Sequence, residues 1–342
     1  MIVVPDSRLF RKIFIFFLLL GFAYLTSYQQ YRHFDITDTR GVSDALTYIR
    51  MSNGDYQNIA SHHSHRFIVP LFAQIIRNLI SPLSNTLNIT NLDCLSFYLV
   101  NIFISTLTSN ILFYLMRSQG FSIEASLFGC FIFLGSRITI ISTGTPLVES
   151  LSYFSVIYII YSSIKSKYNL LVYTAPFIVL TKETTLILLL LPLTIKIFRR
   201  RAYYISIAFS LLVMICTHNY IDIITGNSSI QSTNQLLFSA IPNQVIYSIN
   251  KLFSLQGLHD IQNGYSVFLL FALLGFIYNY KRNILVIHPI LLYLFLVSIL
   301  FAFMNGNFGR MLFISFPLII PISVFYIFTV LNLDLKRSHS YF

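Results

Sequence analysis

Residues 169–198 read NLLVYTAPFIVLTKETTLILLLLPLTIKIF and are followed by three arginines, Arg199, Arg200 and Arg201. The segment is almost entirely apolar, but Lys182 and Glu183 interrupt its middle. As one helix it would be about 45 Å long, too long for a hydrocarbon core of ~30 Å, and it would carry the arginines to the outer side. Two short arms that turn at residues 181–185 keep both ends cytosolic, as the positive-inside rule requires. The segment therefore predicts a short-armed helical hairpin.

The remainder of the chain has the composition of a membrane protein. Of its 342 residues, 56% are hydrophobic and 10% charged, and the mean hydropathy is +0.71. A soluble domain carries about a quarter charged residues, so the bilayer must be the solvent for this chain. The net charge of +11 does not indicate nucleic-acid binding, because much of the excess is Lys and Arg at the ends of apolar runs. The three cysteines lie far apart in or beside apolar runs and predict neither a disulfide nor a metal site.

Apolar runs bounded by cations predict an all-α polytopic protein, with about ten membrane crossings in a single domain over residues 1–342. The first run, residues 13–26, follows Arg8, Arg11 and Lys12 and is expected to be a retained span with a cytosolic N-terminus. The C-terminus is then also cytosolic. Besides the hairpin, further crossings are expected at residues 95–116, 123–143, 151–164, 202–217, 267–278, 284–304 and 311–333.

Residues 67–80 have a different pattern. Their apolar side chains fall on one helical stripe, and Gln74, Arg77 and Asn78 fall off it. A short amphipathic helix of this kind lies in the membrane interface instead of spanning it. Pro70 falls in the first turn, where a missing N–H costs little.

Two polar outer loops are expected, at about residues 29–66 and 218–265. The stretch from His33 to Arg66 holds four of the 12 acidic residues and four of the 8 histidines. The same topology places Glu149, Lys182 and Arg310 on the outer side. Ionisable groups at membrane depth usually line a water-filled cavity, so we expect these separate stretches to form one outer site.

Within the first loop, Ser43 to Gly54 predicts a helix of two to three turns, with Ser43 or Asp44 as its N-cap. Asp44 and Tyr48 are four residues apart and share a helix face. The residue pattern alone favours a capping role for Asp44 over a catalytic one.

Asp44-x-x-x-Tyr48, followed by Arg66-Phe-Ile-Val-Pro70, resembles the first outer loop of bacterial GT-C-type integral membrane glycosyltransferases. In many of these, an Asp-x-x-x-Tyr helix precedes a Pro-Phe-x-x-Arg-x-x-x-Pro stretch. The chain departs from the pattern before Arg66, where a Ser- and His-rich sequence replaces the usual Pro-Phe.

Two later features resemble the same family. Lys182-Glu183 is similar to its intramembrane Arg/Lys-Glu pair, and Arg310, at the start of the last apolar run, also has a counterpart there. The resemblance implies transfer of a sugar, usually with inversion, from a polyprenyl-phosphate donor to a glycan, lipid or protein acceptor. The reaction would take place on the outer face of the bacterial cytoplasmic membrane.

The resemblance also implies roles for particular residues. Asp44 is the first candidate for the general base, followed by Asp38 and Asp35. The acidic pair frequent in the family is spread over these three positions, so the choice among them stays open. Cations at the interface would bind the donor phosphate, and Glu149 would orient the acceptor. The expected substrate-binding residues are Tyr48, Arg66, Glu149, Lys182, Glu183 and Arg310.

No cofactor is predicted. Imidazoles suit zinc, but the closely spaced His62, His63 and His65 rarely complete a site by themselves, so a divalent metal is the less favoured alternative. Two other functions stay open: a polysaccharide polymerase or ligase, and a transporter or flippase of lipid-linked glycans. The former usually has its large loop late in the chain, and transporters tend to show internal repeats, which this sequence lacks.

Overall fold

The computed structural model describes residues 7–35, 44–57, 59–83, 91–226, 242–282, 285 and 287–333. Every regular element in these ranges is a helix, as the sequence predicts. The longer helices are α1 (Ser7–Arg32), α4 (Ile68–Ile80), α5 (Leu92–Ser118), α6 (Ile123–Gly135), α8 (Glu149–Ile164), α9 (Tyr168–Ile178), α11 (Arg201–Thr225), α13 (Leu255–Tyr265), α14 (Phe268–Arg282), α15 (Pro289–Asn305) and α17 (Phe316–Val330). The shorter ones are α2 (Asp44–Ser52), α3 (Ser61–Ser64), α7 (Arg137–Gly144), α10 (Thr184–Leu188) and α16 (Phe308–Leu312). A further helix occupies 242–252. Single 3₁₀ turns lie at η1 (Ser81–Leu83), η2 (Val179–Thr181), η3 (Leu191–Thr194), η4 (Lys196–Phe198) and η5 (Phe313–Ser315).

Several of these helices have the length and composition of membrane spans. Four segments of the described chain qualify singly: Leu9–Arg32, Leu92–Ser118, Arg201–Thr225 and Phe308–Val330. The number rises to 6 if the bent pairs α6–α7 and α13–α14 each count as one span. The expected ten crossings are therefore not confirmed, because α9, α15 and residues 184–194 are apolar but shorter.

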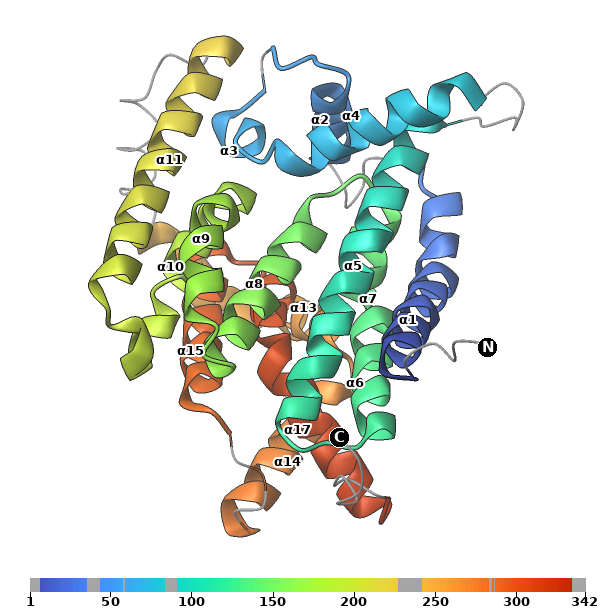
Figure 1. The fold of residues 1–342 in the computed structure, drawn as a ribbon, viewed down its shortest axis with the longest axis vertical. Coiled ribbons are helices and arrows are strands. Elements are labelled where there is room, and N and C mark those ends of the chain that lie inside the picture. The colour runs from blue at the N-terminus through green and yellow to red at the C-terminus, as the bar shows by residue number, and fades with distance from the viewer. Residues whose placement is uncertain are drawn as a thin grey trace, which may run out of the picture.

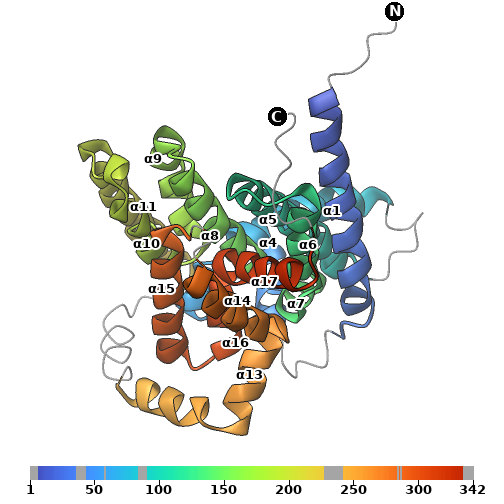
Figure 2. The same ribbon diagram turned by 90° about the horizontal axis from the view of Figure 1, so that it is seen from below.

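Burial separates a central helix from two flanking ones. The last span is 83% buried, whereas only 17% of the first span and 11% of Arg201–Thr225 are buried. Figure 2 shows α17 in the middle of the bundle, with α1 and α11 on opposite flanks. Large apolar side chains such as Phe17 and Phe209 are exposed on the flanking helices. Such surfaces suit contact with lipid tails.

Helices α2, α3 and α4 lie across one end of the bundle, the upper end in Figure 1. There α4 runs crosswise to α5, and it packs Val69 and Ala73 inward. Leu71, Phe72 and Leu79 of the same helix are exposed. An exposed apolar face on a crosswise helix agrees with the expected interfacial helix at 67–80.

The segment 169–198 folds back on itself. The rings of Tyr168 and Phe198, at its two ends, have centroids 5.8 Å apart. Pro176 lacks an N–H and so leaves the carbonyl of Val172 without its helical partner. The hydroxyl of Ser206 on α11 donates to that carbonyl at 2.6 Å, which fastens α9 to α11.

Two elements differ from the sequence-based expectation. The run at 123–143 bends by 61° between α6 and α7, where Ser136 leaves the helical conformation and its hydroxyl accepts from the backbone N–H of Thr139. Helix α11 continues to Thr225 instead of ending near Thr217, and Gly226, at φ 72°, ends it in the left-handed conformation. The first part of the expected second loop, from His218, is therefore helical.

Candidate functional site

Arg310 is positioned by the turn between α15 and α16. Gly306 ends α15 at φ 71°, and a Cβ there would lie 2.7 Å from Gln244 Nε2. The side chain of Asn307 then caps α16 by accepting from the backbone N–H of Arg310 at 3.1 Å. This cap holds Arg310 in the first turn of α16, with its side chain directed toward α8.

Glu149 is the first residue of α8 and is presented by a turn that α5 holds. The amide of the fully buried Asn101 donates to the carbonyls of Thr145 and Leu147 at 3.2 and 3.0 Å. The hydroxyl of Ser150 in turn donates to Asn101. The turn is thereby fixed by polar groups from a helix 44 residues earlier in the chain.

Glu149 and Arg310 form an ion pair, with Oε1 and Nη1 3.0 Å apart. The Glu149 side chain is only 6% exposed. Its second oxygen, Oε2, is buried and has no hydrogen-bond partner among the described residues. Lys182 lines the same small pocket and lies within electrostatic range of both groups. The pocket thus contains two cations and the carboxylate of Glu149, whose Oε2 can still accept a hydrogen bond.

The break between α9 and α10 places Lys182 at this pocket. Lys182 has extended backbone, φ −170°, between η2 and α10. The Thr185 hydroxyl bonds back to the Lys182 carbonyl at 2.6 Å, and Thr181 bonds to Ser155 of α8 at 3.1 Å. Hydroxyl groups stabilise this turn, although it contains neither Gly nor Pro.

Glu183 points toward the loop end of the molecule, where its Oε2 lies 3.6 Å from Nη2 of Arg66. Arg66 follows α3, and its Nε is buried without a hydrogen-bond partner among the described residues. The hairpin turn and the first loop are therefore joined by an ion pair across more than a hundred residues of sequence.

Asp44 is the first residue of α2, and its Oδ1 lies 3.8 Å from His63 Nε2. The Tyr48 hydroxyl is 3.4 Å from the other ring nitrogen of His63. Burial raises the pKa of the fully buried Tyr48, so its hydroxyl stays protonated and can donate to His63. Burial and the neighbouring His62 lower the pKa of His63, which favours its neutral form. A neutral ring that accepts from Tyr48 directs its N–H toward Asp44.

The structure brings most of the predicted site residues to one end of the molecule. Asp44 and Tyr48 lie within electrostatic range of Arg310, so the first loop and the α8–α16 pocket are neighbours. Asp35 is exposed, just beyond the end of α1. Asp38 lies outside the described residues.

The three closely spaced histidines do not act together. His62 and His63 pack against each other, with ring centroids 3.9 Å apart. His65 instead stacks on His218 of α11 at 3.7 Å, and its Nε2 lies 3.1 Å from Asp222 Oδ1. His218 and Asp222 fall in the expected second outer loop, and the sequence predicts no role for them. Their spacing of four residues at the end of an apolar helix is the signal that a shared polar face was present.

Apolar crevices flank the polar end. One, of about 330 Å³, lies between α4, α5 and α8, and Leu151, two residues after Glu149, is one of its lining residues. Its lining residues are Phe72, Ile76, Leu99, Val100, Phe103, Ile104, Leu107, Leu151 and Phe154. A second, of about 680 Å³, lies between α9 and α11 and reaches Leu180.

No protein-family model, no curated protein and no solved structure matches this chain.

Proposed function

We propose that this protein is a GT-C-type glycosyltransferase, which transfers a sugar from a polyprenyl-phosphate donor to an acceptor on the outer side of a bacterial cytoplasmic membrane. One observation carries the proposal. Four stretches far apart in sequence bring Asp44, Arg66, Glu149, Lys182 and Arg310 to one end of a helical bundle, beside apolar crevices. Cations next to an apolar crevice match a substrate that is an anion attached to a hydrocarbon tail.

The reaction assigns one step to each group. Asp44 removes the proton from the acceptor hydroxyl, whose oxygen attacks the anomeric carbon of the sugar. The bond between that carbon and the phosphate oxygen breaks, and polyprenyl phosphate leaves with the electron pair. Lys182 and Arg310 stabilise the charge that develops on the leaving phosphate. His63, held by Tyr48, positions the Asp44 carboxylate.

Glu149 has two roles in this scheme. Its Oε1 holds Arg310 in place, and its Oε2, which has no hydrogen-bond partner in the described part of the chain, accepts a hydrogen bond from a sugar or acceptor hydroxyl. The crevice between α4, α5 and α8 would take the first isoprene units of the donor, because its apolar lining includes Leu151, two residues after Glu149, and Phe72 and Ile76 of the interfacial helix.

The direct test is sugar transfer by the full-length protein in proteoliposomes. The donors are a panel of polyprenyl-phosphate-linked hexoses and pentoses, and the acceptor is a cell-envelope extract. We expect Asp44→Asn to lower turnover by about 10²-fold or more, the usual contribution of a general base.

Asp55→Asn is the matched control, since Asp55 is an exposed acid in the same loop. It should retain wild-type turnover. Both variants should insert and purify as the wild type does. Wild-type turnover in Asp44→Asn would overturn the assignment of the base, and no transfer from any donor by the wild type would favour a transporter.

The proposed orientation has its own test. It places both termini in the cytosol, the α2–α4 end outside, and about ten crossings between them. In a cysteine-free background, a cysteine at the exposed Asn53 should react with an impermeant reagent added outside, and one at the exposed Lys165 only after permeabilisation. A cysteine at Thr184 should be labelled from the same side as Asn53. Cytosolic labelling at Thr184 would refute the outer hairpin turn.

A further inference from the structure

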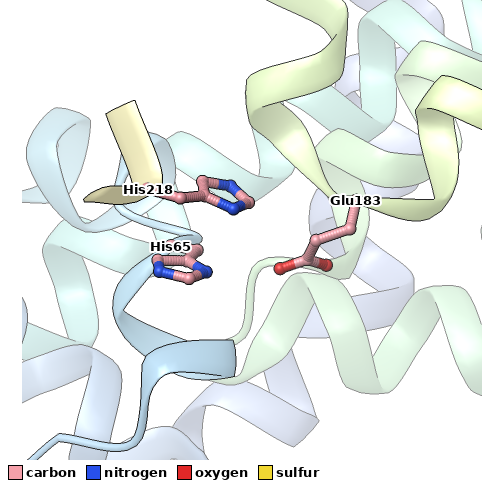
Figure 3. Close-up of side chains that lie close together, drawn as sticks. All are labelled: His65, Glu183 and His218. Atoms are coloured by element: carbon pink, nitrogen blue, oxygen red, sulfur yellow. The ribbon is translucent and has the colours of Figure 1, made fainter. Parts of the chain in front are cut away.

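His65, Glu183 and His218 meet although they come from three separate elements. His65 ends α3, Glu183 lies in the break before α10, and His218 is on α11. One ligand atom from each lies within 4.8 Å of the other two. Figure 3 shows the two imidazole rings one above the other, with the Glu183 carboxylate facing them. All three residues are partly buried.

The chemistry of the three donors is that of a zinc site. Two imidazoles and one carboxylate are a recurrent set of protein ligands for Zn²⁺, with a fourth position left for water or substrate. Around a tetrahedral ion with bonds of roughly 2.1 Å, the donor atoms are about 3.4 Å apart. The two rings are now stacked and nearly parallel, with centroids 3.7 Å apart, so a shared ion requires one imidazole to turn about its side-chain bonds until both lone pairs point at the metal.

A histidine that binds zinc usually donates its other ring N–H to a hydrogen-bond acceptor, and Asp222 is in position to accept from His65. Its Oδ1 lies 3.1 Å from His65 Nε2, and its side chain is only 10% exposed. A carboxylate that accepts from one ring nitrogen fixes the tautomer and leaves the lone pair of the other nitrogen for a metal. Figure 3 shows one nitrogen of His65 turned toward Glu183 and the other turned away.

The charges around His65, Glu183 and His218 are compatible with a bound cation. Glu183 and Asp222 contribute two carboxylates, and the described groups of opposite charge nearest to Glu183 are Arg66 and Lys182. Arg66 contacts only one oxygen of Glu183, at 3.6 Å, which is longer than a good charge-assisted hydrogen bond. The Glu183 carboxylate also accepts from its own backbone N–H, and it faces the two imidazoles (Figure 3).

We propose that His65, Glu183 and His218 bind a divalent transition-metal ion of the zinc class, with Asp222 orienting His65. This site is separate from the Glu149–Lys182–Arg310 pocket and does not depend on the proposed sugar transfer. The ion would join the first loop, the hairpin turn and α11 at the same end of the molecule.

Metal binding is measured on the full-length protein in detergent after treatment with a chelator. Zn²⁺ should bind at one ion per chain, and Co²⁺ should give the visible absorption of a tetrahedral site. His218→Ala and Glu183→Gln should weaken Zn²⁺ binding more than 100-fold. Asp222→Asn should weaken it by about 10- to 100-fold, the usual effect of a residue that orients a ligand.

His259→Ala is the matched control, because His259 is an exposed histidine paired only with Asn263 among the described residues. It should bind Zn²⁺ as the wild type does. The wild type should also melt at a higher temperature with Zn²⁺ than with chelator, a measurement that needs no variant to fold. If the His65–Asp222 contact is only structural, Zn²⁺ will leave the melting temperature unchanged. That result, or wild-type Zn²⁺ binding by His218→Ala, would overturn the proposal.

Discussion

Two ion pairs at the same end of the molecule differ in the surroundings of their charges. Arg50 and Asp55 are five residues apart in the first loop, 2.8 Å apart in space, and both side chains are 46% exposed. Glu149 and Arg310 are 161 residues apart, and their pair is slightly longer, at 3.0 Å, but Glu149 is almost completely buried. Surface pairs contribute little because water screens them and they order two flexible side chains. Removal of one partner from a buried pair leaves a charge without compensation. Burial rather than distance therefore decides which pair the fold depends on.

Replacement of Glu149 by Gln gives the largest expected effect. The change removes the carboxylate whose negative charge balances Arg310 and Lys182, and Arg66 also lies within electrostatic range. These cations are then left near one another without that negative charge. We expect a loss of about 3 kcal/mol in the free energy of unfolding, measured by denaturant titration in mixed micelles. Sugar transfer should also fall, because Arg310 loses the partner that positions it.

A double-mutant cycle measures the interaction free energy between Glu149 and Arg310 apart from their interactions with the rest of the pocket. Arg310→Gln alone should also destabilise the protein, but it should cost much less in the Glu149→Gln background. Additivity of the two changes within about 0.5 kcal/mol would mean that the two side chains do not stabilise one another.

The order of helices and turns that brings the buried pair together could be predicted from the sequence. Apolar runs bounded by cations located the helices, and the central Lys182-Glu183 predicted that residues 169–198 fold back. Glu149 and Arg310 lie at the starts of such runs, and Lys182 lies at the turn of the hairpin, so the topology predicted that all three share one end. Each inference needed only hydrophobicity, length and charge.

What the sequence did not predict depends on side-chain contacts between distant elements. His65 and His218 are more than 150 residues apart, and no local pattern connects them. Asn101, which holds the turn before Glu149, occurs in an apolar helix where its amide gives no sign of its partners. The bend at Ser136 had a local signal, the Gly-Ser pair before Arg137, but the apolar run continues across it.

The His63 side chain is intermediate in exposure between the Arg50–Asp55 pair and Glu149. Its side chain is 18% exposed, and burial lowers the pKa of His63 below the value of about 6.5 expected in the unfolded chain. The folded state therefore binds this proton less readily than the unfolded state. The stability from neutral His63 is complete above pH 6.5 and is lost as the pH falls toward the folded-state pKa.

The measurement is the melting temperature of wild type and His63→Gln between pH 7.5 and 5. Both proteins should lose stability in acid, since other groups titrate there, but the decline should be smaller in His63→Gln. Parallel curves would show that His63 titrates alike in the folded and unfolded chain.

Arg50 and Asp55 should give the smallest effect. The guanidinium of Arg50 lowers the pKa of Asp55 through a hydrogen bond, yet both groups are open to water. Arg50→Gln should leave the unfolding midpoint unchanged within error at physiological salt, because screening and side-chain ordering offset the attraction. A decrease like that of Glu149→Gln would mean that the first loop is covered in the membrane-bound protein. In that case the Arg50–Asp55 pair would be shielded from water, as the Glu149 side chain is.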